Sequence, residues 1–184
     1  MATELNRESL FVNFLTGVLP KANIVQLGVS LNQLNFFTAP ASIHHHGAYD
    51  GGLFDHSYLV ARNLVDLTKK LNLEWERPES PYLVGMLHDL CKCDNYKRTK
   101  PDDTHPEAWA YSNGQLLTGH GDKSVMMVQQ IMSITEEEML CIRWHMGAFD
   151  SDKNWNAYGQ SITKYPNVLW THTADMMAAR IQGV

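Results

Sequence analysis

The middle of the chain reads Ser80-Pro81-Tyr82-Leu83-Val84-Gly85-Met86-Leu87-His88-Asp89-Leu90, an apolar stretch with an adjacent histidine and aspartate. Ser80-Pro81 is typical of a helix N-cap and first turn, so we expect a helix that contains His88 and Asp89. The apolar residues predict that this helix is buried. A buried carboxylate is costly unless a metal ion or another partner compensates for its charge. The stretch therefore predicts a metal site within a helical core.

Helical periodicity dominates the rest of the chain. Apolar stripes predict an N-terminal helix at about 7–18 and another from His56 to Leu71. A capping box begins at Thr135, and Pro166 opens a last helix that runs to about Ile181. We expect an all-α fold of five to seven helices. A small β-hairpin near 108–118 is the one exception, because Trp109-Ala110-Tyr111 and Gln115-Leu116-Leu117 flank an Asn-Gly turn.

The bulk properties predict a single soluble domain over residues 1–184. The 44% hydrophobic and 19% charged residues are ordinary for a globular protein. A net charge of −5 argues against a broad nucleic-acid-binding surface. The N-terminus lacks signal-peptide features, no apolar run is long enough for a membrane span, and the three cysteines suggest reduced thiols. We therefore expect a cytoplasmic protein without a membrane partner.

His88 and Asp89 can share an ion only where helices pack together, because adjacent helical residues point about 100° apart. His56, at the start of its helix, and Asp175, inside the last one, could complete a set of two imidazoles and two carboxylates. Mixed nitrogen and oxygen ligands suit Mn²⁺, Fe²⁺, Co²⁺, Ni²⁺ or Zn²⁺, and Mg²⁺ also stays open.

A second ion is also expected. Asp89 has a second oxygen that could bridge to an ion held by His120 and His145. Two ions about 3.5–4 Å apart can clamp a phosphate and generate a hydroxide nucleophile, which Asp89 would orient. The simpler alternatives are a loop histidine at position 120 and a helix-closing cation at position 145.

The ordered set His56…His88-Asp89…Asp175 resembles the H…HD…D signature of the HD-domain metal-dependent phosphohydrolases. The resemblance covers about residues 44–180 and implies a catalytic core at about 44–182. It implies a helical HD-domain fold and the hydrolysis of phosphate monoesters or diesters, often of nucleotides. His120 and His145 fall where binuclear members carry their extra ligands. Cys91 stands where glycine is common in the family, whereas Lys92 is retained.

Several residues are candidates for substrate contact. Lys92 follows His88 by four residues, so a helix would place it on the same face, where it could bind phosphate or stabilise a leaving oxygen. His45 and His46 lie in a glycine-rich loop that could reach the mouth of the site, and Lys123 follows His120 by three residues. Solvent-exposed positions are the alternative for each. Asp89 and Lys92 are the expected catalytic residues.

Three functions fit these residues. The first is hydrolysis of small phosphate esters, with nucleotides or related phosphorylated molecules as substrates and one or two divalent ions as cofactors. The second is a 3′–5′ exonuclease-like phosphodiesterase on single strands, which the His44-His45…Gly51-Gly52…His56 run resembles, although no nucleic-acid-binding module is evident. The third is a non-catalytic domain that binds a metal or a nucleotide. The sequence leaves the oligomeric state and the exact substrate open.

Overall fold

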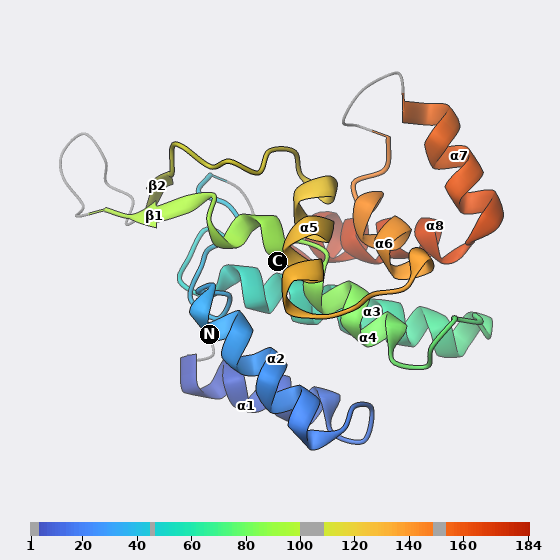
Figure 1. Ribbon diagram of the computed structural model, residues 1–184, viewed down its shortest axis with the longest axis horizontal. Helices are drawn as coiled ribbons and strands as arrows, with labels where there is room; N and C mark the ends of the chain where they lie inside the picture. The colour runs from blue at the N-terminus through green and yellow to red at the C-terminus, as the bar shows by residue number, and fades with distance from the viewer. Residues whose placement is uncertain (1–3, 45–46, 100–108, 149–153) are drawn as a thin grey trace.

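The computed structural model describes residues 4–44, 47–99, 109–148 and 154–184 (Figure 1). These ranges contain eight α-helices and one small sheet, which confirms the expected all-α fold and exceeds the expected number of helices by one. In chain order the elements are α1 (Glu4–Leu15), α2 (Lys21–Gln33), α3 (Gly52–Leu71), α4 (Ser80–Leu87), a 3₁₀ helix (Leu90–Cys93), β1 (Tyr96–Arg98), β2 (Trp109–Tyr111), α5 (Gly121–Ile131), α6 (Glu136–Arg143), α7 (Trp155–Lys164), α8 (Asn167–Met176) and a π-helical turn (Met177–Gln182).

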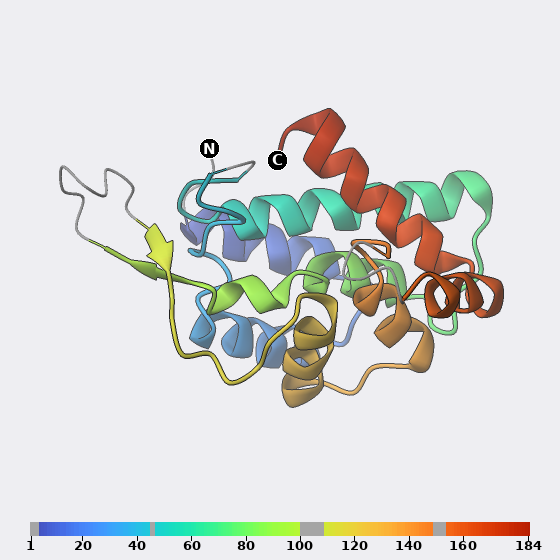
Figure 2. The ribbon, with the colours of Figure 1, turned by 90° about the horizontal axis from the view of Figure 1, so that it is seen from above.

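Helix α3 is the central element, with α4 and α8 packed along it (Figures 1 and 2). Leu53, Val60 and Leu64 of its apolar stripe are fully buried. Gly85 allows α4 to approach closely, because a Cβ atom there would lie 2.3 Å from the Cα atom of Ala61 in α3. The close packing of α3 and α4 brings the segments that carry the predicted ligands together.

Helix α4 is shorter than the sequence predicted. It ends at Leu87, His88 is its C-cap, and Asp89 lies in a turn before the 3₁₀ helix. The backbone of Asp89 has φ −104° and ψ 22°, which departs from helical geometry. The expected divergence of about 100° between adjacent helical side chains therefore does not apply here.

The N-terminal helix α1 packs against both α2 and α3 (Figure 1). Helix α1 ends three residues earlier than the predicted range of 7–18, because the chain turns at Gly17, which has φ 83°. Arg7 in α1 is 4% exposed and forms a bidentate ion pair with Asp55, with Nε–Oδ1 and Nη2–Oδ2 distances of 2.9 and 3.0 Å. This pair joins α1 to the first turn of α3.

The small sheet is a hairpin whose second strand, β2, was predicted correctly at Trp109–Tyr111. Its partner is β1, with Tyr96 opposite Tyr111, rather than the expected segment at 115–117. The amide of Gln115 instead donates to the carbonyl oxygens of Asp94 and Ser112, at 2.9 and 3.0 Å. These bonds hold the segment after β2 against the loop that precedes β1.

The predicted capping box is present at the start of α6, where Thr135 and Glu138 exchange hydrogen bonds. The buried Glu138 carboxylate also accepts from Ser80 at 2.7 Å and pairs with Arg77. These bonds fix the start of α4 against α6. Over the described ranges, no helix combines the length and apolar character that a membrane span requires.

Candidate metal centre

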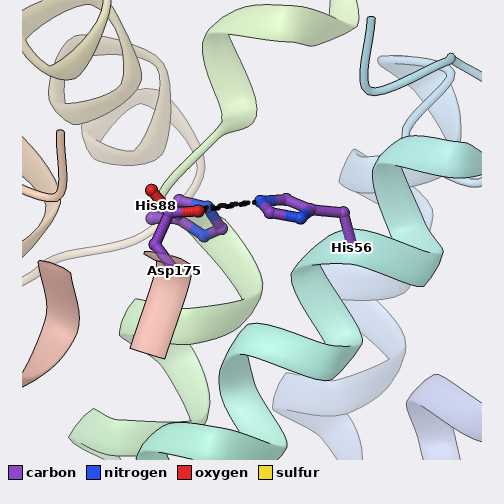
Figure 3. Close-up of side chains that lie close together, drawn as sticks. All are labelled: His56, His88 and Asp175. Carbon is purple, nitrogen blue, oxygen red and sulfur yellow. Dashed lines mark hydrogen bonds and ion pairs between the residues drawn. The ribbon is translucent and has the colours of Figure 1, made fainter. Parts of the chain in front are cut away.

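Three side chains from separate helical segments converge at the centre of the fold (Figure 3). His56 comes from the second turn of α3, which begins at Gly52 and not at His56 as predicted. His88 comes from the end of α4 and Asp175 from α8. The Nε2 atoms of His56 and His88 lie 3.3 Å apart, and the Oδ1 atom of Asp175 lies 3.1 Å from the first and 3.9 Å from the second. All three side chains are buried. The structure thus brings together three of the four ligands predicted for the first ion.

Asp89, the fourth predicted ligand, lies between two groups of histidines. Its Oδ2 atom is 3.6 Å from the Nε2 atom of His56 and 3.5 Å from that of His88. Its Oδ1 atom is 2.9 Å from the Nε2 atom of His120 and 3.3 Å from that of His145. One carboxylate therefore faces two sets of nitrogen atoms, one with each oxygen.

Backbone carbonyl groups fix the tautomer of three of the four histidines. The Nδ1 atom of His56 lies 2.8 Å from the carbonyl oxygen of Val184, and that of His88 lies 2.8 Å from the carbonyl oxygen of Gly85. The Nδ1 atom of His145 lies 2.7 Å from the carbonyl oxygen of Ile142. A carbonyl oxygen only accepts hydrogen bonds, so each Nδ1 atom carries a proton. In the neutral rings the lone pair is then on Nε2, the nitrogen nearer to Asp89 or Asp175. This is the usual arrangement of metal-binding histidines.

Three atoms of this cluster have no hydrogen-bond partner among the described residues although they are buried. They are Asp89 Oδ1, His120 Nε2 and His145 Nε2, which are close to one another but lack hydrogen-bond geometry. Buried polar atoms without partners are costly. A divalent cation would satisfy all three, and their nitrogen and oxygen chemistry suits the first-row transition metals. The residues present therefore fit a metal ion.

Opposing effects set the charges at the centre. Burial works to raise the pKa of Asp89, but Lys92, His88 and His120 hold it well below its usual range. Burial lowers the pKa of His145, so this imidazole is neutral and offers its lone pair. Burial would also lower the pKa of His120, yet the Asp89 carboxylate raises it to about 10. Asp89 is thus ionised, as a bridging ligand must be.

Comparisons of the chain with family models, curated proteins and solved structures gave no significant match. The chemistry of the centre is therefore inferred from its own geometry.

Lys92 lies beside the shared carboxylate. Its Nζ atom is 2.7 Å from Asp89 Oδ2, and 13% of its side chain is exposed. The residue belongs to the 3₁₀ helix, not to the helix of His88 as expected, so it reaches the centre by a different backbone path. Its ammonium group is nonetheless at the centre.

Of the other residues predicted to contact substrate, only Lys123 is among the described residues. Lys123 is 2% exposed, and its ammonium group contacts the side-chain oxygen of Asp94 and that of Asn95, the latter at 2.9 Å. Its charge is therefore used within the fold, and we do not propose it as a substrate ligand. His45 and His46 lie outside the described residues.

The structure also shows two residues that support the histidines of the centre. The Sγ atom of Cys91 lies 3.3 Å from the Nδ1 atom of His120. The Nδ1 atom of His172 donates to the carbonyl oxygen of His145 at 2.6 Å. Only His172 had a sequence signal, namely its spacing of three residues from Asp175 on one helix. The contact of Cys91 depends on tertiary packing.

Proposed function

We propose that the chain is a metal-dependent phosphohydrolase that cleaves phosphate esters of nucleotides or related small molecules. The observation that carries the proposal is the position of Asp89, whose two oxygens face two separate groups of imidazole nitrogens. A carboxylate shared in this way is typical of sites for two divalent ions, and such sites are commonly used to cleave phosphate esters. The resemblance to the H…HD…D signature points to the same chemistry.

The ligands fall into two sets. His56, His88, Asp175 and the Oδ2 atom of Asp89 would hold one ion. His120, His145 and the Oδ1 atom of Asp89 would hold the other. Bound ions would lower the pKa of a water molecule at the site and neutralise charge on the phosphoryl oxygens.

The protein side chains would contribute orientation and charge. Asp89 stays ionised, so its oxygens can accept a hydrogen bond from the attacking water and orient it. The Lys92 ammonium group adds a positive charge beside this carboxylate, and its exposed part is available to a phosphoryl oxygen of the substrate. Burial of His56, His88 and His145 excludes bulk water from them and strengthens these electrostatic interactions.

The test is an assay of the purified protein after it has been loaded with Mn²⁺, Co²⁺ or Ni²⁺. Substrates are nucleoside monophosphates, bis(4-nitrophenyl) phosphate and a single-stranded oligonucleotide. We expect turnover of a small ester, with a loss of about 100-fold or more in Asp89→Asn. Asp66→Asn is the matched control, because Asp66 is an exposed residue of α3.

The choice of substrates in this assay distinguishes the three functions. Stepwise shortening of the oligonucleotide, without turnover of the small esters, would identify the exonuclease-like alternative. A protein that binds metal but cleaves none of the substrates would contradict hydrolysis. Stabilisation by a nucleotide without turnover would then support the non-catalytic alternative.

A further inference from the structure

Cys91 joins the turn that carries Asp89 to the segment that carries His120. Its side chain is fully buried, and its Sγ atom lies 3.3 Å from the Nδ1 atom of His120. Its backbone N–H donates to the Oγ atom of Ser124 at 3.1 Å, and the N–H of Ser124 donates to the carbonyl oxygen of His120 at 3.0 Å. The sulfur atom is therefore held against one particular ring nitrogen.

His120 differs from the other three histidines of the centre in this partner. Their Nδ1 atoms face carbonyl oxygens, whereas the Nδ1 atom of His120 faces sulfur. For Nε2 of His120 to offer a lone pair, its Nδ1 atom must be the protonated nitrogen, and that N–H needs an acceptor. The Sγ atom of Cys91 is in the position to accept it.

We propose that Cys91 is the positioning residue for His120, and that it selectively supports the ion held by His120 and His145. This inference rests on the proposed metal centre and does not depend on which reaction the protein catalyses. The other ion should not depend on Cys91, because His56 and His88 are oriented by the carbonyl groups of Val184 and Gly85. The buried, unpartnered atoms Asp89 Oδ1 and His145 Nε2 mark the site that Cys91 would support.

A Co²⁺ titration of the full-length, metal-free protein tests the proposal, with the bound ions counted by equilibrium dialysis and followed by visible absorption. We expect two ions in the wild type. In Cys91→Ala we expect one affinity to be unchanged and the other to fall by about 10–100-fold, the usual effect of losing a partner of a metal-binding histidine. Cys91→Ser should restore the second ion, since a hydroxyl oxygen also accepts a hydrogen bond.

Cys93→Ala is the matched control, because Cys93 is a buried cysteine of the same 3₁₀ helix. It should bind two ions as the wild type does, and thermal unfolding of each variant identifies any general loss of stability. The proposal would be overturned if Cys91→Ala bound both ions as tightly as the wild type does. It would also be overturned if the wild type bound no second ion.

A sulfur-to-cobalt charge-transfer band in the wild type would also overturn the positioning role. Asp89, Cys91 and His120 have ligand atoms within 4.8 Å of one another, so direct ligation by the thiolate is the competing arrangement. Two bound ions without hydrolysis of any ester would contradict the proposed function and leave the role of Cys91 intact.

Discussion

The Nε2 atoms of His56 and His88 lie 3.3 Å apart although both rings have protonated Nδ1 atoms. Two neutral imidazoles in these tautomers would direct their lone pairs at each other. A proton on one Nε2 atom or a cation at the pair removes this repulsion. The nearby carboxylates of Asp89 and Asp175 would stabilise the positive charge of such a proton or of a metal cation. A metal ion bound at this pair would therefore supply the positive charge that its geometry favours.

Metal affinity should increase with pH. The Asp89 carboxylate outweighs the effect of burial and raises the pKa of His120 from 6.5 to about 10, so the metal-free protein holds a proton there at neutral pH. The stability gained from that proton is complete below pH 6.5 and is lost as the pH rises through about 10. Because an ion must displace the proton, we expect about a tenfold gain in affinity per pH unit for each proton released.

Calorimetric titration in two buffers of different ionisation enthalpy would measure this proton release. Binding that releases no proton at pH 7, or an affinity that is constant between pH 7 and 9, would contradict the linkage.

Substitution of individual ligands should separate the two sets. We expect Asp175→Asn to weaken the ion shared with His56 and His88, and His145→Gln to weaken the ion shared with His120. Asp89→Asn should weaken both, because each set uses one of its oxygens. Metal content after dialysis at a fixed free concentration gives the stoichiometry. Identical losses in Asp175→Asn and His145→Gln would show that the two sets are not separate.

Gly85→Ala should destabilise the fold and disturb the centre. The added Cβ atom would lie 2.3 Å from the Cα atom of Ala61, so α4 must move away from α3 and shift His88 with it. We expect a loss of about 1–3 kcal/mol in the free energy of unfolding, together with weaker metal binding.

Gly159→Ala provides the control, because a Cβ atom on this exposed α7 residue meets no atom within 4 Å. That substitution should stabilise the protein by about 0.5–1 kcal/mol. Urea denaturation measures both variants. A Gly85→Ala protein as stable as the wild type would show that the contact between α3 and α4 is not tight.

Arg7→Met should destabilise the protein by leaving the Asp55 carboxylate without its bidentate partner. The Arg7 side chain is 5% exposed and that of Asp55 is 20% exposed, so the lost interaction is largely shielded from solvent. We expect a loss of about 2–4 kcal/mol on urea denaturation and weaker binding of the ion at His56, the residue next to Asp55. Arg62→Met, on the exposed face of α3, should change stability by about 0.5 kcal/mol or less. Equal stability of the two variants would refute a structural role for the Arg7–Asp55 pair.

The sequence was sufficient to predict the helical fold and the residues that gather at the centre. Apolar periodicity located α3 from His56 onward, and Pro166 marked the start of α8, which ends at Met176 and continues as a π-helical turn to Gln182. A carboxylate such as Asp89 in an apolar stretch indicated a buried site because its burial requires compensation. These signals are local, so they can be read along the chain.

The features that the sequence did not predict depend on contacts between distant segments. The end of α4 at Leu87 and the pairing of β1 with β2 are set by neighbouring segments. Lys123 resembles an exposed lysine in sequence, and only its contacts with Asp94 and Asn95 account for its burial. The contact between Cys91 and His120 joins residues 29 positions apart, so spacing alone could not indicate it.

A crystal structure of the protein with Mn²⁺ or Co²⁺, with anomalous scattering to locate the ions, tests the metal centre most directly. We predict two anomalous peaks that share Asp89. One should contact His56, His88 and Asp175, and the other should contact His120 and His145. Crystals grown with excess metal that show no ion at Asp89, or ions only at surface carboxylates, would contradict the proposal.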